Sequence, residues 1–373
     1  IQSRLKRSGN NLKPFASGSI NPKRTERVRV VDTVHRFILT SAQNNTYVNE
    51  ACWNNLLAFG KHYKAEILVG TYSYNMNAYG KLAVKRGTKV PYQSDLWYDP
   101  KLADYIEAGD NRNIEIGPHL MWCGRANVLP TATRPLQGFE NYSGRHSGIF
   151  PHAKQEMESI AAVKTEATKF NYTTGTVTQQ NYIQKKAGLK AEQAHTYGGL
   201  IVEVCKDGRW YVRQLVDVNG VMCDLDVKSV NGKITTGNRI VAINWGDVHC
   251  ATLQQSIYNL EFESDGMLDL LRPQYQFFHD SLDWKARDLH AIWKRLPIDR
   301  FINYVLGFDS VENEIRNVAN FFQNTQRPWC QSIVVSSNHD DFFVRWLDFA
   351  DHKSDPINAR FYLHASAYMY DYM

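Results

Sequence analysis

Three short polar segments of the chain each follow a hydrophobic stretch that is typical of a buried β-strand. They are Gly246-Asp247-Val248-His249, His279-Asp280-Ser281-Leu282-Asp283 and Asn338-His339-Asp340. Ligands of open α/β sheets bind beyond the carboxyl ends of the strands, so segments far apart in sequence can converge there. Carboxylates, neutral imidazoles and an amide oxygen are ligands for hard or borderline divalent cations. The pattern therefore predicts a centre for two metal ions, which could polarise a phosphate and supply a hydroxide near neutral pH.

The stretches before these segments alternate with helical patterns. The expected strands are Arg239–Trp245, Tyr275–Phe278 and Ser332–Ser336. Residues 251–271 are expected to be mostly helical, and residues 310–324 are expected to form an amphipathic helix. Strands that alternate with helices indicate a parallel or mixed sheet covered on both faces. Residues 237–373 are therefore predicted to form an α/β domain that carries the three polar segments.

The preceding part of the chain has its own strand and helix signals. A strand at Arg36–Thr40, a helix over 47–62 and a strand at Ala65–Val69 predict a βαβ unit. Two apolar runs, Gly198–Val204 and Arg209–Leu215, flank Lys206-Asp207-Gly208 and predict a hairpin. We expect a basic arm and linker over 1–27, an N-terminal α/β domain over 28–236 and the second domain over 237–373.

Composition restricts the class of protein. The chain of 373 residues suits two domains, and no apolar run reaches the roughly 18 residues of a membrane span, which excludes an integral membrane protein. The six cysteines form no C-x-x-C pair, which favours a reducing compartment and a cytoplasmic location. Neither a P-loop nor a G-x-G-x-x-G motif is present, so the use of ATP or NAD is not indicated.

The positive charge is concentrated at the N-terminal end. The formal net charge is +5, yet residues 1–27 hold seven basic residues and one acidic residue, so the remainder is close to neutral. Such an arm suits a polyanion such as DNA, although a solvated, flexible end is an equally good interpretation. The candidate DNA-binding residues are Arg4, Lys6, Arg7, Lys23 and Arg24.

The order D-x-H, D-x-x-D and N-H-D resembles the calcineurin-like metallophosphoesterases, in which each motif follows a strand. The resemblance implies an α/β sandwich and two divalent metal ions. Mn²⁺ is the preferred metal, and Mg²⁺ is the alternative. It also implies roles for individual residues: Asp247 and His249 bind the first metal, Asp280 bridges both, Asn338 binds the second, His339 is the general acid, and Asp340 orients it. Asp283 and His279 would lie in a second shell around the metals. His290, in the segment after Asp283, is a further second-shell candidate, and an ordinary histidine on a helix face is an equally good interpretation.

The sequence departs from the family pattern at several positions. His279 and Ser337 stand where the family has glycine, and Trp284 stands where it has arginine. No G-H-x-H motif follows Asp340, and His364 lies in an aromatic stretch that reads as a helix. We therefore expect the sandwich to be incomplete in this chain, with a C-terminal portion lying beyond it.

The resemblance extends to a family of phage proteins that join an extra N-terminal domain to a metallophosphoesterase core. This family includes the pre-early host-DNA-degradation proteins of T-five-like siphophages, and the similar segments include 40–46, 130–136 and 174–182. It implies a phage-encoded, metal-dependent DNase that acts on host DNA in the host cytoplasm, and a homo-oligomer is expected. Two alternatives remain open: a small-substrate phosphodiesterase or phosphatase with the same site, and a non-catalytic DNA-binding or assembly protein.

Two features of the N-terminal domain are weaker candidates. Glu203 and Lys206 are spaced one residue off the E-x-K pattern of restriction-type nucleases, and a solvated strand end explains them better. His195, close to Gly198-Gly199, could touch a ligand, but a hydrogen-bonded structural histidine is the more common case.

Overall fold

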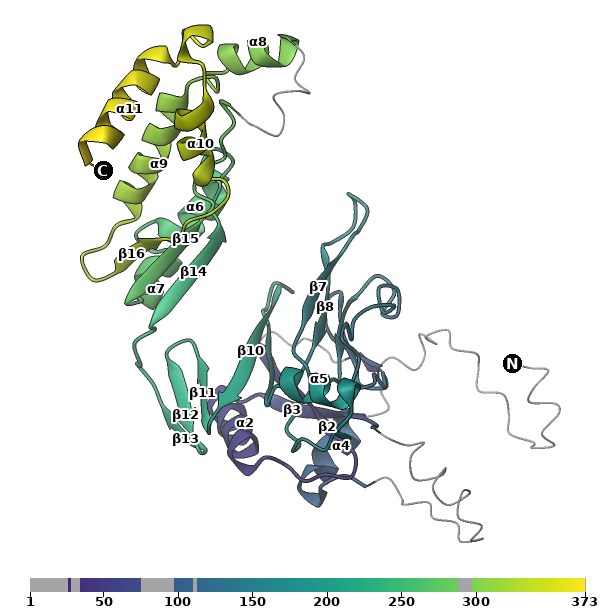
Figure 1. Ribbon diagram of the computed structural model, residues 1–373. Coiled ribbons are helices and arrows are strands. Elements are labelled where there is room, and N and C mark those ends of the chain that lie inside the picture. The colour runs from purple at the N-terminus through teal and green to yellow at the C-terminus, as the bar shows by residue number, and fades with distance from the viewer. Residues whose placement is uncertain (1–25, 28–33, 75–96, 110–112, 288–296, 373) are drawn as a thin grey trace, which may run out of the picture. The chain divides into compact units, whose positions relative to one another are not determined.

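The computed structural model describes residues 26–27, 34–74, 97–109, 113–287 and 297–372 (Figure 1). It is a mixed α/β protein whose chain divides between Thr236 and Gly237 into two compact units, here called unit 1 and unit 2. Among the described residues, no helix combines the length and the apolar character that crossing a membrane requires.

Unit 1 contains a seven-stranded sheet that includes the predicted βαβ unit. Its strands, in spatial order, are β13 (Lys233–Thr235), β12 (Val227–Val230), β11 (Val221–Asp224), β10 (Trp210–Val218), β9 (Gly198–Val204), β2 (His35–Gln43) and β3 (Glu66–Tyr72). The βαβ prediction is confirmed, because β2 and β3 are parallel and helix α2 (Glu50–Tyr63) connects them. The hairpin prediction is also confirmed by the antiparallel pairing of β9 with β10.

Helix α2 illustrates why the sequence forms these elements. The side chain of Asn49 accepts a hydrogen bond from the Cys52 N–H and caps the start of the helix. Lys64 adopts the left-handed conformation just after its end, with φ of 53°. Cys52, Leu56 and Phe59 lie on one face and are fully buried in a core shared with the sheet.

A six-stranded sheet completes unit 1. Its strands, in spatial order, are β1 (Glu26–Arg27), β4 (Asn113–Gly117), β5 (Leu120–Cys123), β6 (Ser147–Phe150), β8 (Lys169–Thr173) and β7 (Met157–Ile160). One buried cluster joins Phe37 and Leu200 of the larger sheet to Ile116 and Trp122 of this one, so the two sheets pack together. The described residues of unit 1 also form the helical segments η2 (Pro100–Leu102), α4 (Ala103–Gly109) and α5 (Lys186–Ala194).

Unit 2 is built on three parallel strands in the order β14, β15, β16 (Figure 1). They span Ala242–Asp247, Tyr275–His279 and Gln331–Val334. The predicted α/β arrangement with a parallel or mixed sheet is therefore confirmed in its parallel form, and the first strand is displaced toward Asp247. In the described part of unit 2 this is the one sheet present, and the two-sheet sandwich of the metallophosphoesterases stays a prediction.

The helices of unit 2 lie between and after these strands. They are α6 (Gln255–Phe262), α7 (Met267–Leu271), α8 (Pro297–Val305), α9 (Val311–Thr325), α10 (Asp341–Phe349), η3 (His352–Ser354) and α11 (Ala359–Tyr372). The mostly helical segment expected over 251–271 is confirmed, and it consists of two helices with a break at 263–266. The helix expected over 310–324 is confirmed as α9. Phe262 of α6, Phe278 of β15 and Phe321 of α9 pack together in one buried cluster.

Candidate metal centre

The parallel sheet of unit 2 brings the predicted polar segments to one edge. Asp247 is the last residue of β14 and His279 the last of β15, and the turn with Asn338 follows β16 and precedes α10. Beyond the strands, the first two segments stay paired: the His279 carbonyl accepts from the Val248 N–H at 3.0 Å, and the Asp280 carbonyl accepts from the His249 N–H at 2.9 Å. The side chains of both segments are therefore held close to one another.

Asp247, His279 and Asp280 form the centre of the site. One potential ligand atom from each of the three lies within 4.8 Å of the others. The His279 Nδ1 atom is 3.1 Å from Asp247 Oδ1 and 3.1 Å from Asp280 Oδ2. His279, the residue expected in a second shell, directs its ring nitrogen at both carboxylates. The Asp247 side chain is 65% exposed and that of Asp280 only 9%, so the cluster runs from the surface inward.

Asp280 is a buried carboxylate that keeps its charge. Burial by itself raises the pKa of Asp280, but the Ser337 hydroxyl and the positive potential of His279 and His339 outweigh it and leave the pKa below its ordinary value. Its second oxygen, Oδ1, is buried without a hydrogen-bond partner. An ionised oxygen that is buried and unpaired is costly, which makes this atom a strong candidate to bind a cation.

Two imidazoles lie beside this cluster with unused ring nitrogens. The rings of His249 and His339 meet edge to face, with centroids 5.0 Å apart. The Nδ1 atoms of both are buried and lack a hydrogen-bond partner, and that of His249 is 3.5 Å from Asp283 Oδ1. Neither imidazole belongs to the group of three ligand atoms that lie close together in the described part of the chain, but imidazole nitrogens and carboxylate oxygens are donor types that divalent transition metals prefer. The donor chemistry thus fits the metal ions implied by the family resemblance.

Asp283 holds the segment that carries His249. Its carboxylate accepts hydrogen bonds from the Ala251 N–H at 2.7 Å and from the Thr252 hydroxyl at 3.2 Å. Both segments need this support, because His249 in one and Asp280 in the other have left-handed backbone conformations, with φ of 45° and 46°. Such conformations cost about 1–3 kcal/mol each in non-glycine residues and occur frequently at functional sites.

Asp340 has partners that differ from those expected for a residue that orients His339. Its carboxylate accepts a hydrogen bond from the Leu282 N–H at 3.2 Å and another from the Ser337 hydroxyl at 2.8 Å. These bonds tie the third polar segment to the second. Asp340 therefore fixes the position of the turn that contains Asn338 and His339.

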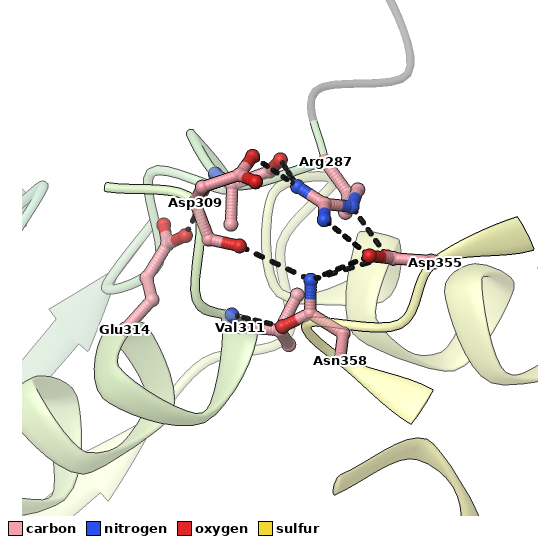
Figure 2. Close-up of polar contacts among 7 residues, drawn as sticks. Arg287, Asp309, Val311, Glu314, Asp355 and Asn358 are labelled. Atoms are coloured by element: carbon pink, nitrogen blue, oxygen red, sulfur yellow. Dashed lines mark hydrogen bonds and ion pairs between the residues drawn. The ribbon is translucent and has the colours of Figure 1, made fainter. Parts of the chain in front are cut away.

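A buried polar network supports the chain directly after Asp283, at the start of helix α9 (Figure 2). The Glu314 carboxylate accepts from the backbone N–H groups of Lys285 and Ala286 at 3.0 and 3.1 Å. Burial raises the pKa of Glu314, and the nearby charge of Asp283 adds to the effect. The loop that carries Asp280 and Asp283 is therefore anchored to α9.

Arg287 forms the other half of this network (Figure 2). Its guanidinium binds both oxygens of Asp355 at 2.6 Å and Asp309 Oδ1 at 2.6 Å. Asn358 donates to the Asp309 carbonyl and accepts from the Val311 N–H. The network joins three segments that are far apart in sequence.

Sequence reasoning missed Arg287 and Glu314. A signal for Glu314 was present, because it lies in the apolar stripe of α9 with Val311, Val318 and Phe321, which are all buried. A charged residue in such a stripe indicates a buried polar partner. Nothing in the sequence marks Asp309 and Asp355 as the partners of Arg287.

The remaining predicted site residues are placed as follows. Asn338 is exposed in the turn before α10. His290 lies outside the described residues, as do the basic residues of the arm, Arg4, Lys6, Arg7, Lys23 and Arg24.

The two weaker candidates of unit 1 have structural partners. The Glu203 carboxylate is bound by Arg36 Nε and Arg213 Nη1, both at 2.5 Å. Both ring nitrogens of His195 are also used, by the Tyr182 hydroxyl at 2.7 Å and the Thr178 carbonyl at 3.1 Å. Structural roles therefore account for both residues, but the solvated strand end expected for Glu203 is wrong, because its side chain is only 20% exposed and is bound by two arginines.

Fold and site together define an α/β protein with an Asp/His cluster at the carboxyl edge of a parallel sheet. The chain is similar to a phage protein, Protein A1 of Escherichia phage T5, with 33% identity over 376 aligned residues. The alignment covers 97% of this chain and 64% of the relative, so the chain spans just under two thirds of that protein's length. No family model matches the chain, and no solved structure matches it.

Proposed function

We propose that this chain belongs to a phage-encoded, metal-dependent nuclease that hydrolyses DNA phosphodiester bonds, acting early in infection on host DNA in the host cytoplasm. The single observation that carries the proposal is the buried, unpaired Oδ1 atom of Asp280 beside Asp247 and His279. Site geometry supports the metal chemistry. The similarity to a phage T5 protein over 97% of the chain supports the phage origin.

The residues that would hold two divalent cations, with Mn²⁺ preferred and Mg²⁺ as the alternative, follow from the family resemblance. Asp247 and His249 would bind the first, Asp280 would bridge both, and Asn338 would bind the second. When bound, such cations polarise a phosphate and activate water near neutral pH. Asp283 and Asp340 would keep these donors in place through their bonds to Ala251 and Leu282.

His339 would hold the proton that the leaving oxygen needs. Imidazole suits this task because it can both carry and release a proton near neutral pH. The ring of His339 lies against His249 and against Phe342, with centroids 5.0 and 5.4 Å apart, and the Asp340 bonds fix the turn that carries it. Its position between the donor cluster and α10 supports the role of general acid.

DNA as the substrate rests on the resemblance to phage host-DNA-degradation proteins and on the basic residues of 1–27. The three polar segments alone would serve a smaller phosphate ester equally well. Cleavage of plasmid DNA and of a small phosphate ester therefore distinguishes between these substrates.

The test is cleavage of plasmid DNA and of bis(p-nitrophenyl) phosphate in the presence of Mn²⁺, with the bound metal of each variant measured in parallel. We expect His339→Ala to reduce turnover by about 10²–10⁴-fold with near-normal metal content, which is the usual contribution of a general acid. Asp280→Ala should lose the metal itself. The control is His364→Ala, because His364 is exposed on α11.

Three outcomes would change the proposal. Equal cleavage by His339→Ala and wild type would remove the acid role from His339. Hydrolysis of the small ester without cleavage of DNA would replace the nuclease with a small-substrate phosphodiesterase. Binding of DNA with no hydrolysis of either substrate would favour the non-catalytic alternative.

A further inference from the structure

We infer that His279 is itself a metal ligand of this centre, so that the site combines an imidazole from β15 with the carboxylates of Asp247 and Asp280 and favours Mn²⁺, Co²⁺ or Zn²⁺ over Mg²⁺. This inference rests on the proposed function, because it concerns the same centre. It adds a ligand at a position where the resembled family has glycine.

The position of the ring nitrogen supports this assignment. His279 Nδ1 is 3.1 Å from one oxygen of Asp247 and 3.1 Å from one oxygen of Asp280. A ring nitrogen carries at most one hydrogen, which cannot point along both directions, and only the contact to Asp247 is a hydrogen bond. Two ligands at about 2.1–2.2 Å from a shared cation lie about 3.0 Å apart when they are adjacent in an octahedral shell. Both distances from the His279 nitrogen therefore match the distance between neighbouring ligands of one ion.

The strand sets the direction of the imidazole. Side chains alternate along β15, and Phe278 is fully buried in the core with Phe262 and Phe321. His279, the next residue, therefore projects from the opposite face, where Asp247 lies at the end of β14. Its side chain is 39% exposed, so no packing role in the core explains its position.

The chemical consequence is a change in metal preference. Carboxylate oxygens alone suit Mg²⁺, whereas imidazole nitrogens suit transition metals such as Zn²⁺ and Co²⁺. Addition of the His279 nitrogen to the oxygens of Asp247 and Asp280 should increase affinity for transition metals much more than affinity for Mg²⁺. As a ligand, Nδ1 offers its lone pair and the proton of the neutral ring lies on Nε2.

The test measures metal binding on the complete chain and does not use catalytic activity. Co²⁺ and Mg²⁺ affinities are determined by titration calorimetry, and nitrogen coordination of bound Mn²⁺ is detected by pulsed EPR as ¹⁴N modulation. The variants are His279→Gly, which installs the family residue, and His279→Ala, which removes the imidazole without the added backbone freedom of glycine. The controls are His364→Ala, which removes an exposed imidazole on α11, and Asp280→Ala, which removes the central carboxylate.

We expect both His279 variants to bind Co²⁺ at least about 10-fold more weakly, since even the loss of an outer-shell partner costs that much. Mg²⁺ affinity should change less, and the ¹⁴N modulation should become shallower than in wild type and in His364→Ala. If both variants keep wild-type Co²⁺ affinity and modulation while Asp280→Ala loses the ion, the inference about His279 is overturned and the proposed metal centre stands. If wild type binds no divalent cation, the inference and the proposed function both fail.

Discussion

The Asp340 carboxylate accepts a hydrogen bond from the backbone N–H of Leu282 at 3.2 Å and so connects two polar segments that lie 58 residues apart. Leu282 is buried, and it belongs to the segment that contains Asp280 and Asp283. The bond makes the position of the His339 turn depend on the segment that follows β15. It also gives Asp340 a structural task that can be separated from chemistry.

Replacement of Asp340 should therefore affect stability before it affects proton transfer. Asp340→Ala leaves the Leu282 N–H without an acceptor, and we expect a loss of about 1–3 kcal/mol in the free energy of unfolding, measured by urea denaturation. Asp340→Asn keeps an acceptor oxygen for Leu282 and should remain close to wild type in stability. If Asp340→Ala unfolds at the wild-type urea concentration, the bond to Leu282 contributes nothing to stability and the structural role assigned to Asp340 is wrong.

The Arg287 network should be a major source of stability in unit 2 (Figure 2). The side chains of Arg287, Asp309 and Asp355 are only 10%, 9% and 14% exposed, so Arg287→Met leaves two buried carboxylates unpaired. We expect a loss of about 3–5 kcal/mol in the free energy of unfolding. The matched control is Arg316→Met, which removes an exposed ion pair with Glu312. The side chain of Arg316 is 70% exposed and that of Glu312 is 42% exposed, so this pair should contribute about 0.3–0.5 kcal/mol. Equal effects of the two substitutions would contradict this assignment.

The same network predicts how unit 2 responds to acid. Burial alone would raise the pKa of Asp355, but the hydrogen bonds and charge of Arg287 outweigh it and lower the pKa below its ordinary value. A lowered carboxyl pKa stabilises the fold fully above the unfolded-state pKa of about 3.9, and this contribution is lost as the pH falls through the folded-state value. Arg287→Met should therefore flatten the acid limb of the stability curve relative to Arg316→Met. Parallel acid limbs for the two variants would show that Arg287 does not set this titration.

His195 predicts a second pH effect, in unit 1. Burial, reinforced by the nearby His152, lowers its pKa to about 4 despite the hydrogen bond to Thr178. The neutral ring stabilises the fold above the unfolded-state pKa of about 6.5, and this contribution decreases as the pH falls toward 4. By linkage, His195 should remove about 2 kcal/mol of stability between pH 7 and pH 5.

The measurement compares urea unfolding of wild type, His195→Gln and His62→Gln at pH 7 and pH 5. The free energy of unfolding of His195→Gln should change less between pH 7 and pH 5 than that of wild type. Part of the change should remain, because burial also lowers the pKa of His152. His62 is exposed on α2, and its replacement should leave the wild-type difference unchanged. A difference that is the same in all three proteins would argue against a buried neutral His195.

The basic arm should contribute affinity for DNA without contributing chemistry. Deletion of residues 1–25 removes six of its seven basic residues and leaves strand β1, which pairs with β4 through Glu26 and Arg27. The slope of the logarithm of the DNA association constant against the logarithm of the salt concentration should become less steep. The expected change is about 0.9 for each phosphate that the arm no longer neutralises. Hydrolysis of bis(p-nitrophenyl) phosphate should be unaffected. An unchanged salt slope in a fluorescence-anisotropy titration would show that the arm does not bind DNA.

Much of the local structure and the place of the site could be predicted from the sequence. The helix–strand alternation predicted three strands of a parallel or mixed sheet in unit 2, and all three form and run parallel. Because parallel strands end at one edge, the position of Asp247 and Asp280 at that edge followed directly. These features depend on periodicity and on the order of elements, which are local properties of the chain.

Only the tertiary structure decided which side chains meet. The orientation of His279 depends on which face of β15 is buried, and the partners of Asp340 depend on how the turn after β16 packs against the segment after β15. Arg287 finds Asp309 and Asp355 across 22 and 68 residues of sequence. Such pairings are set by the packing of helices on the sheet, which no local pattern encodes. The sequence thus determined the types of donor available and the edge where they gather, and the three-dimensional packing determined which of them share one site.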